Sequence, residues 1–237
     1  MTQKKISRYI ILLSSLLLCA YSAFAQQPQQ RGIQYVEEKV DSLQQKDIHV
    51  FQGVQLGVDL AGALLANVSS YGSYEGYVRF NIKEKYFPVV EVGLGYSNYT
   101  NDATDLHFKT NSPFIRVGCD YNFAKDKHSG NRVYGGVRLG YSSFKFNQDG
   151  PNIVDPIWVG QSIPLSYKNQ KSNGSWFELV FGLEAKIKGP FHLGWTLRYK
   201  KRLSQKELEW GKAWCIPGYG ENDNHLFTGT FNVILDI

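Results

Sequence analysis

Histidine, cysteine and serine are the first candidates for chemistry in this 237-residue chain. They are spread too widely to form a metal-binding motif. The sequence also lacks a nucleophile elbow, a phosphate loop and a dinucleotide fingerprint. We therefore expect no catalytic residue, no metal site and no cofactor. The histidines are His49, His107, His128, His192 and His225.

A second set of reactive side chains consists of acids and bases that recur with a period of two. Six acids and six bases lie opposite apolar residues and are interleaved with glycine. Opposite charges in near balance fit a narrow interior in which they pair. We predict an internal charge network formed by Asp59, Glu75, Arg79, Glu91, Arg116, Asp120, Arg138, Glu178, Glu184, Lys186, Arg198 and Lys200.

These charges belong to alternating segments that begin after Val50. Alternation of apolar and polar residues is the pattern of strands with two different faces. In the cleanest segment, Phe177 and Leu179 face one way while Glu178 faces the other. Short connections at 83–86, 124–131 and 189–190 alternate with others, two of which are long, at 147–174 and 204–224. The eight segments are 51–66, 70–82, 87–99, 107–123, 132–146, 175–188, 191–203 and 225–237.

Alternation is shared by soluble and membrane barrels, so the charged face and the aromatic residues decide between them. Paired charges inside and apolar residues outside favour an all-β, eight-stranded antiparallel up-and-down transmembrane β-barrel with a filled interior. Aromatic belts are expected at both membrane interfaces. On the loop side these are Tyr71, Tyr74, Tyr96, Tyr99, Phe144, Trp176 and Tyr199. On the turn side they are Phe51, Phe80, Tyr86, Phe87, Tyr121, Phe123 and Phe191.

From Phe51 to Ile237 the chain resembles small outer-membrane barrels of the OmpX and OmpA transmembrane-domain type. It is also similar to uncharacterised families of secreted single-barrel proteins. The resemblance rests on architecture, so it assigns no functional residue. It implies two partners, outer-membrane lipid and the barrel-insertion machinery. The last strand alternates like an insertion signal, although it ends in Ile237 where many such barrels end in Phe.

The N-terminus predicts export. Residues 1–25 combine a basic start, an apolar stretch and the site Ala23-Phe24-Ala25, as in a cleaved signal peptide. A lipoprotein signal at Cys19 would need a small residue where Leu18 stands. Residues 26–49 form a polar segment, either flexible or with one short helix, and residues 50–237 form the barrel. We therefore place the protein in the outer membrane.

Charge and cysteine content narrow the partners further. Without the leader the chain has 23 basic and 21 acidic residues, so a nucleic-acid partner gains no support. Cys119 and Cys215 are predicted on opposite sides of the membrane, too far apart for a disulfide.

The long connections carry the functional expectation. We expect a structural role or surface interaction through 147–174 and 204–224, with a ligand or protein partner that the sequence does not name. Exposed aromatics there could anchor a partner. An alternative is that they fold over the mouth and pack on each other. The contact candidates are Trp158, Trp210, Trp214 and Tyr219.

Three other functions remain as alternatives. A lipid-modifying enzyme could use His107 and His225 at the outer rim, with Ser97 and Asp105 nearby. A narrow solute pore is the second alternative. A soluble periplasmic ligand-binding barrel is disfavoured, because its inner face would be full of charges.

Overall fold

The computed structural model describes residues 50–124, 130–154, 162–163, 165–208 and 212–237. The predicted signal peptide and the polar segment 26–49 lie outside these residues. So do two of the four loop contact candidates, Trp158 and Trp210.

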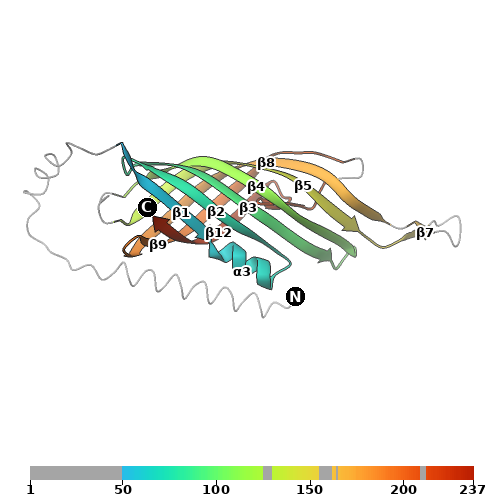
Figure 1. Cartoon of the computed structure of the whole chain (residues 1–237). Helices are drawn as coiled ribbons and strands as arrows, with labels where there is room; N and C mark the ends of the chain where they lie inside the picture. Colours follow the sequence, from blue (N-terminus) through green and yellow to red (C-terminus); the bar gives the residue numbers. More distant parts are fainter. Residues whose placement is uncertain (1–49, 125–129, 155–161, 164, 209–211) are drawn as a thin grey trace, which may run out of the picture. The chain divides into compact units, whose positions relative to one another are not determined.

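Eight antiparallel strands close into one barrel (Figure 1). Around the ring their order is β1, β12, β9, β8, β5, β4, β3, β2. Each barrel strand is therefore hydrogen-bonded to the barrel strands that precede and follow it in the chain, and the first pairs with the last. The ring closes where β1 pairs with β12, from Gln55 opposite Asp236 to Asp59 opposite Asn232. The predicted up-and-down topology is thus confirmed. The barrel strands are β1 (Phe51–Asp59), β2 (Tyr71–Ile82), β3 (Tyr86–Asn101), β4 (Leu106–Asn122), β5 (Arg132–Asp149), β8 (Ser166–Lys188), β9 (Phe191–Gln205) and β12 (His225–Asp236).

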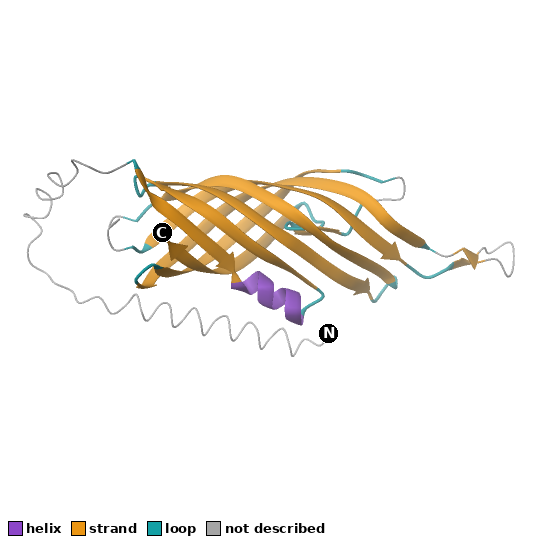
Figure 2. Cartoon of the chain, in the orientation of Figure 1, coloured by secondary structure: helices purple, strands orange, loops and turns teal. Residues whose placement is uncertain are grey.

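The first predicted strand, 51–66, is wrong in its second half. β1 ends at Asp59, and helix α3 (Leu60–Val68) follows it (Figure 2). The Asp59 carboxylate caps the helix by accepting the Ala61 and Gly62 N–H groups at 3.0 and 2.9 Å. Leucine and alanine fill most of α3, and both favour helix once an N-cap is present.

The long connections begin later than the sequence indicated, because their strands continue. β5 and β8 stay paired as far as Asp149 opposite Ser166, and the short strands β6 (Ile153–Val154) and β7 (Ser162–Ile163) follow. Figure 1 shows this hairpin extending past the other strands. Strand β9 likewise continues to Gln205, before the small strands β10 (Cys215–Ile216) and β11 (Gly220–Glu221).

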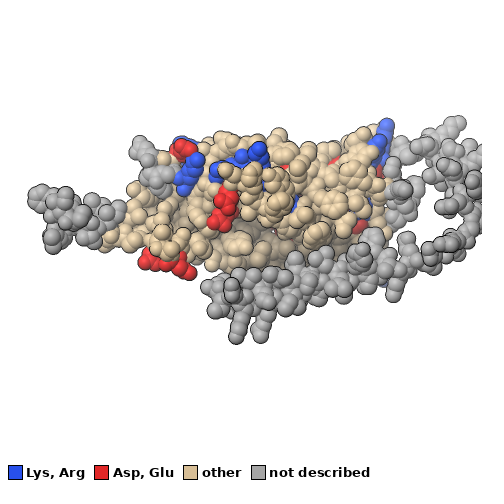
Figure 3. Space-filling model, turned by 180° about the vertical axis from the view of Figure 1, so that it is seen from behind, with Lys and Arg blue, Asp and Glu red and all other residues tan. Residues whose placement is uncertain are grey.

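Apolar side chains cover the outside of the barrel. Val92, Leu139 and Phe181 are 54%, 56% and 46% exposed, although each lies in the middle of a strand. The face in Figure 3 is mostly uncharged surface, with the charged residues gathered in a few groups. Many inward residues are polar or charged and buried, which reverses the arrangement of a soluble barrel. This is the architecture of a transmembrane β-barrel.

The aromatic belts are only partly as predicted. At the turn end Phe51, Tyr86, Phe123 and Phe191 are exposed on the outside. The belt prediction is wrong for Phe87, Phe144 and Trp176, which are buried because each shares the inward face with the charges of its own strand. Tyr99 also faces inward, at the mouth. Among the described residues, no helix is long and apolar enough to cross a bilayer.

Candidate functional site

Glu91 occupies the centre of the barrel interior and contacts three arginines. Its carboxylate oxygens lie 2.8 Å from Arg116 Nε, 3.0 Å from Arg138 Nε and 2.7 Å from an Arg198 terminal nitrogen. Glu91 comes from β3, and the arginines come from β4, β5 and β9. The contact with Arg198 therefore crosses the lumen between strands that are not neighbours.

Two further acids complete this central layer. Glu178 pairs with Arg116 at 3.3 Å and with Arg198 at 3.2 Å, and it accepts the Trp176 indole N–H at 2.6 Å. Asp120 receives two hydrogen bonds from the guanidinium of Arg138, at 2.7 and 2.8 Å. Such bidentate pairs are strong because both donors fit both oxygens.

A second layer lies towards the turn end and is organised by Glu184. This carboxylate accepts hydrogen bonds from Arg79, at 3.0 Å, and from Arg132. The Arg79 guanidinium also lies over the rings of Tyr77 and Tyr134, 5.2 and 4.6 Å from their centroids. Ring faces attract cations, so the two tyrosines add to the stabilisation of a buried charge.

Glycines on the inward face make room for these rings. A Cβ added at Gly182 would lie 2.3 Å from the Tyr134 ring, and one at Gly140 would lie 2.2 Å from the Trp176 ring. The interleaved glycines therefore reflect close approach across neighbouring strands, which leaves little free space in the lumen.

The structure brings together most of the predicted charge network. Two members differ in role: Asp59 caps α3, and Lys200 Nζ donates to the carbonyls of Gly218 and Tyr219 at 2.8 and 3.1 Å. The prediction is wrong for Lys186, whose side chain is exposed at the turn end of β8, beside an irregular strand pairing. Those that join the network directly are Glu75, Arg79, Glu91, Arg116, Asp120, Arg138, Glu178, Glu184 and Arg198.

Several interior residues were missed by the sequence prediction. Arg132 and Tyr134 have the same strand parity as Arg138, so the alternation of β5 already indicated that they face inward. His192 is the second residue of β9 and lies 3.2 Å from Glu184, while Gln55 donates to the same carboxylate at 3.3 Å. Gln55 has the same strand parity as Asp59, so the alternation of β1 also indicated that it faces inward.

The described parts of the connection after β9, residues 206–208 and 212–224, are here called the mouth loop and fold into the barrel. Its residues Ile216 and Tyr219 are fully buried against inward aromatics of the strands. Trp214 stacks on Tyr99 with 4.4 Å between ring centroids. For Trp214 and Tyr219 the packing alternative therefore describes the structure, and Tyr219 is not an exposed contact. The strand residues of this cluster are Phe108, Phe114, Phe144, Phe146 and Trp176.

The described cysteines are unpaired, and the two rim histidines are far apart in the ring of strands. Cys119 and Cys215 are both unpaired, as expected. Burial raises the pKa of the Cys215 thiol to about 12. His107 on β4 and His225 on β12 lie four strands apart in a ring of eight, so the two histidines of the enzyme alternative are on opposite sides. Groups of three or more metal-binding side chains are absent from the described residues.

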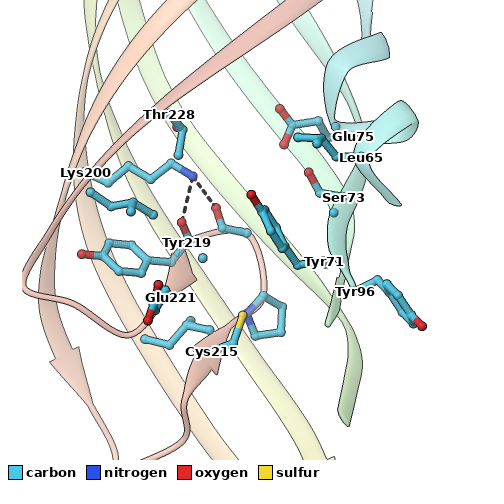
Figure 4. Close-up of a pocket in the computed structure, with 18 of the residues that line it drawn as sticks. Leu65, Tyr71, Ser73, Glu75, Tyr96, Lys200, Cys215, Tyr219, Glu221 and Thr228 are labelled. Carbon is cyan, nitrogen blue, oxygen red and sulfur yellow. Dashed lines mark hydrogen bonds between the residues drawn. The ribbon is translucent and has the colours of Figure 1, made fainter. Parts of the chain in front are cut away.

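A cavity of about 310 Å³ lies beside the mouth loop, between α3, β2 and β12 (Figure 4). Its polar lining includes Glu75, Lys200 and Thr228, and Leu65 of α3 adds an apolar side chain. We call it the side cavity. No sequence pattern indicated it, because it depends on where β1 ends.

The sequence from residue 6 to residue 236 matches the model of a protein family described as a domain of unknown function, DUF6048. The chain belongs to this family. No curated protein sequence matches it.

Three solved barrels are similar to this member of the family. Neisserial surface protein A is 16% identical, with 80% of this chain and 98% of that chain covered and a TM-score of 0.42. A major outer membrane protein from Thermus thermophilus is 11% identical, covering 80% and 100%, with a TM-score of 0.42. The N-terminal β-barrel domain of Pseudomonas aeruginosa OprF is 12% identical, covering 79% and 99%, with a TM-score of 0.39. The closed ring of strand pairs defines the fold independently of these likenesses.

Proposed function

We propose that this protein is an outer-membrane β-barrel that acts structurally or in surface interaction, without catalysis. One observation carries the proposal: apolar side chains are exposed all around the outside while ion pairs fill the inside. In water, that exterior would be an unusually large exposed apolar surface. In a bilayer it meets lipid, and barrel closure satisfies most backbone hydrogen bonds between strands.

Export and insertion follow from the chain ends. The leader at 1–25 directs secretion, and its removal leaves Gln26 as the new N-terminus. The last strand then presents Phe231, Val233 and Leu235 on one face to the insertion machinery.

The interior supports a closed barrel more than a pore. Arg116, Arg138 and Glu178 are at most 1% exposed in the centre, and the mouth loop fills the outer end. A surface partner would therefore meet the extended β5–β8 hairpin first, with Trp214 as a half-buried residue at the rim.

Cell fractionation combined with detergent gel electrophoresis tests the proposal. A closed membrane barrel should be found in the outer-membrane fraction and should migrate differently before and after boiling. Intact mass of the purified protein should correspond to a chain that starts at Gln26. Recovery from the soluble fraction, with one mobility before and after boiling, would contradict the membrane assignment.

A further inference from the structure

The barrel wall has a gap in its outer half, because β1 is short. β1 pairs with β12 only at Asn232–Asp236, whereas β9 pairs with β12 from His225 onward. On the other side, β1 reaches β2 only as far as Gly76, so Tyr71–Glu75 has no strand partner there. Two strand edges therefore face each other without a strand between them.

Helix α3 occupies part of this gap and contacts both β2 and β12. A Cβ at Gly72 would lie 2.2 Å from the backbone nitrogen of Ala66, so the helix lies directly on β2. At the β12 side, Asp59 accepts the Phe231 N–H at 3.0 Å. Gly229 has the same parity as Phe231, so its backbone groups point to the same edge, beyond the last β1 pairing.

The side cavity lies along the unpaired edge of β12. Residues 227–230 all line it, and the β1 partners of β12 end at Asn232. Successive residues of a strand point to opposite faces, so Thr228 and Thr230 point inward while Phe227 and Gly229 point outward. The cavity therefore borders the part of the wall that has no strand between β12 and β2.

The inner end of the side cavity is polar and balanced in charge. Glu75 lies opposite Lys200, as Figure 4 shows, and both are charged side chains that point into the cavity. The Thr228 hydroxyl is buried and has no hydrogen-bond partner among the described residues. The acids that line the cavity are Asp59, Glu75 and Glu221, and the bases are Arg116, Arg198 and Lys200.

The outer end of the cavity is apolar. Leu65 of α3 and Phe227 of β12 line it, and Phe227 is 68% exposed. The volume of about 310 Å³ is at the lower end of the range for small-molecule sites, roughly 300–1,000 Å³. A cavity of this volume can hold the polar head of a lipid but not a whole lipid with two acyl chains.

We propose that the side cavity binds the zwitterionic head of a membrane amphiphile, whose acyl chain leaves past Phe227 of β12 into the bilayer. Balanced acids and bases favour a head that carries both charges, and the free Thr228 hydroxyl supplies an unused hydrogen bond. The chain meets lipid as soon as it passes Phe227. This inference rests on the proposed membrane position of the barrel.

Native mass spectrometry of the detergent-purified full chain tests the site with lysophosphatidylethanolamine as the probe. Gly229→Trp should close the gap, since a Cβ there meets only the Thr196 carbonyl oxygen, at 3.6 Å. Thr228→Val removes the hydroxyl at nearly constant volume. Leu139→Trp is the matched control, because it places the same indole on lipid-facing β5, across the ring from the gap.

We expect one retained lipid per wild-type and Leu139→Trp chain, with retention lowered about tenfold by Gly229→Trp, because the indole occupies the path of the ligand. Thr228→Val should weaken retention about threefold to tenfold, the effect of one lost hydrogen bond. Equal retention in all four proteins, or none in wild type, would overturn the site. Preference for lysophosphatidylglycerol would overturn the zwitterionic head. The heat-dependent mobility is measured in parallel; its absence in wild type would instead contradict the barrel, and the site with it.

Discussion

The Glu91 carboxylate balances the positive charge of more than one buried guanidinium. Its two oxygens contact arginines from three different strands, and the carboxylate is only 3% exposed. Burying an arginine without a partner is costly, because water is lost and nothing replaces it. The stability of the central layer therefore depends strongly on this one acid.

Replacing Glu91 with Ala should destabilise the barrel by about 3–5 kcal/mol, the usual cost of leaving a buried charge without its partner. The temperature at which the folded band disappears in unboiled gels gives the measurement. Lys186→Ala is the control, because Lys186 is exposed and should have almost no effect. Equal folded-band temperatures for both variants would contradict the role of Glu91.

Cys215 should be almost unreactive in the folded protein. Its thiol is buried, and a pKa of about 12 keeps it protonated at pH 8, whereas the thiolate is the reactive form. In a Cys119→Ser variant, reaction with a water-soluble maleimide should be slower than after boiling by about tenfold or more. Comparable rates in both states would show that the mouth loop does not fill the barrel.

Strand parity predicted the interior better than residue type did. The alternation placed Glu91, Arg138 and Glu178 inside correctly, because each lies mid-strand. The same parity would also have placed Trp176 inside, but an aromatic near a strand end was assigned to the lipid interface instead. Lys186 has inward parity yet is exposed, since the barrel interior ends before it. Depth along the barrel, which alternation does not report, explains that error.

At the scale of elements, α3 depends on a glycine of β2. A Cβ at Gly72 would meet backbone atoms of Ala66, which cannot rotate away. Gly72→Ala should therefore displace α3 and expose 60–68 to protease in the detergent-solubilised barrel. Gly76→Ala is the matched control, because its Cβ would have no neighbour closer than 3.4 Å. Protection of 60–68 in both variants would contradict the close packing.

The eight barrel strands were predictable from the sequence. The helix that follows β1 and the loop that fills the mouth of the barrel were not. Residues 54–59 alternate cleanly. The switch to helix at Leu60 depends on the cap by Asp59, a residue that the alternation also predicts as an interior charge. The mouth loop is polar enough to suggest an exposed loop. Its burial of Ile216 and Tyr219 depends on the inward aromatics of distant strands, which no local pattern joins.

The whole molecule should not conduct ions steadily. Ion pairs cross the lumen at its centre, and the mouth loop fills its outer end. An eight-stranded barrel has an interior just wide enough for side chains. Planar-bilayer recordings of the folded protein should therefore show no stable open level. A reproducible single-channel step, absent from a boiled sample, would support the pore alternative.

The charge network also constrains the order of assembly. Its ion pairs connect β3 with β9 and β2 with β8, strands far apart along the chain. A half-formed sheet would expose unpaired arginines, and such an intermediate is unfavourable at membrane depth. The charges on the first strands are therefore neutralised only when the last strands join the sheet. We therefore expect insertion of this barrel to be cooperative, with strand closure and charge pairing coupled to each other.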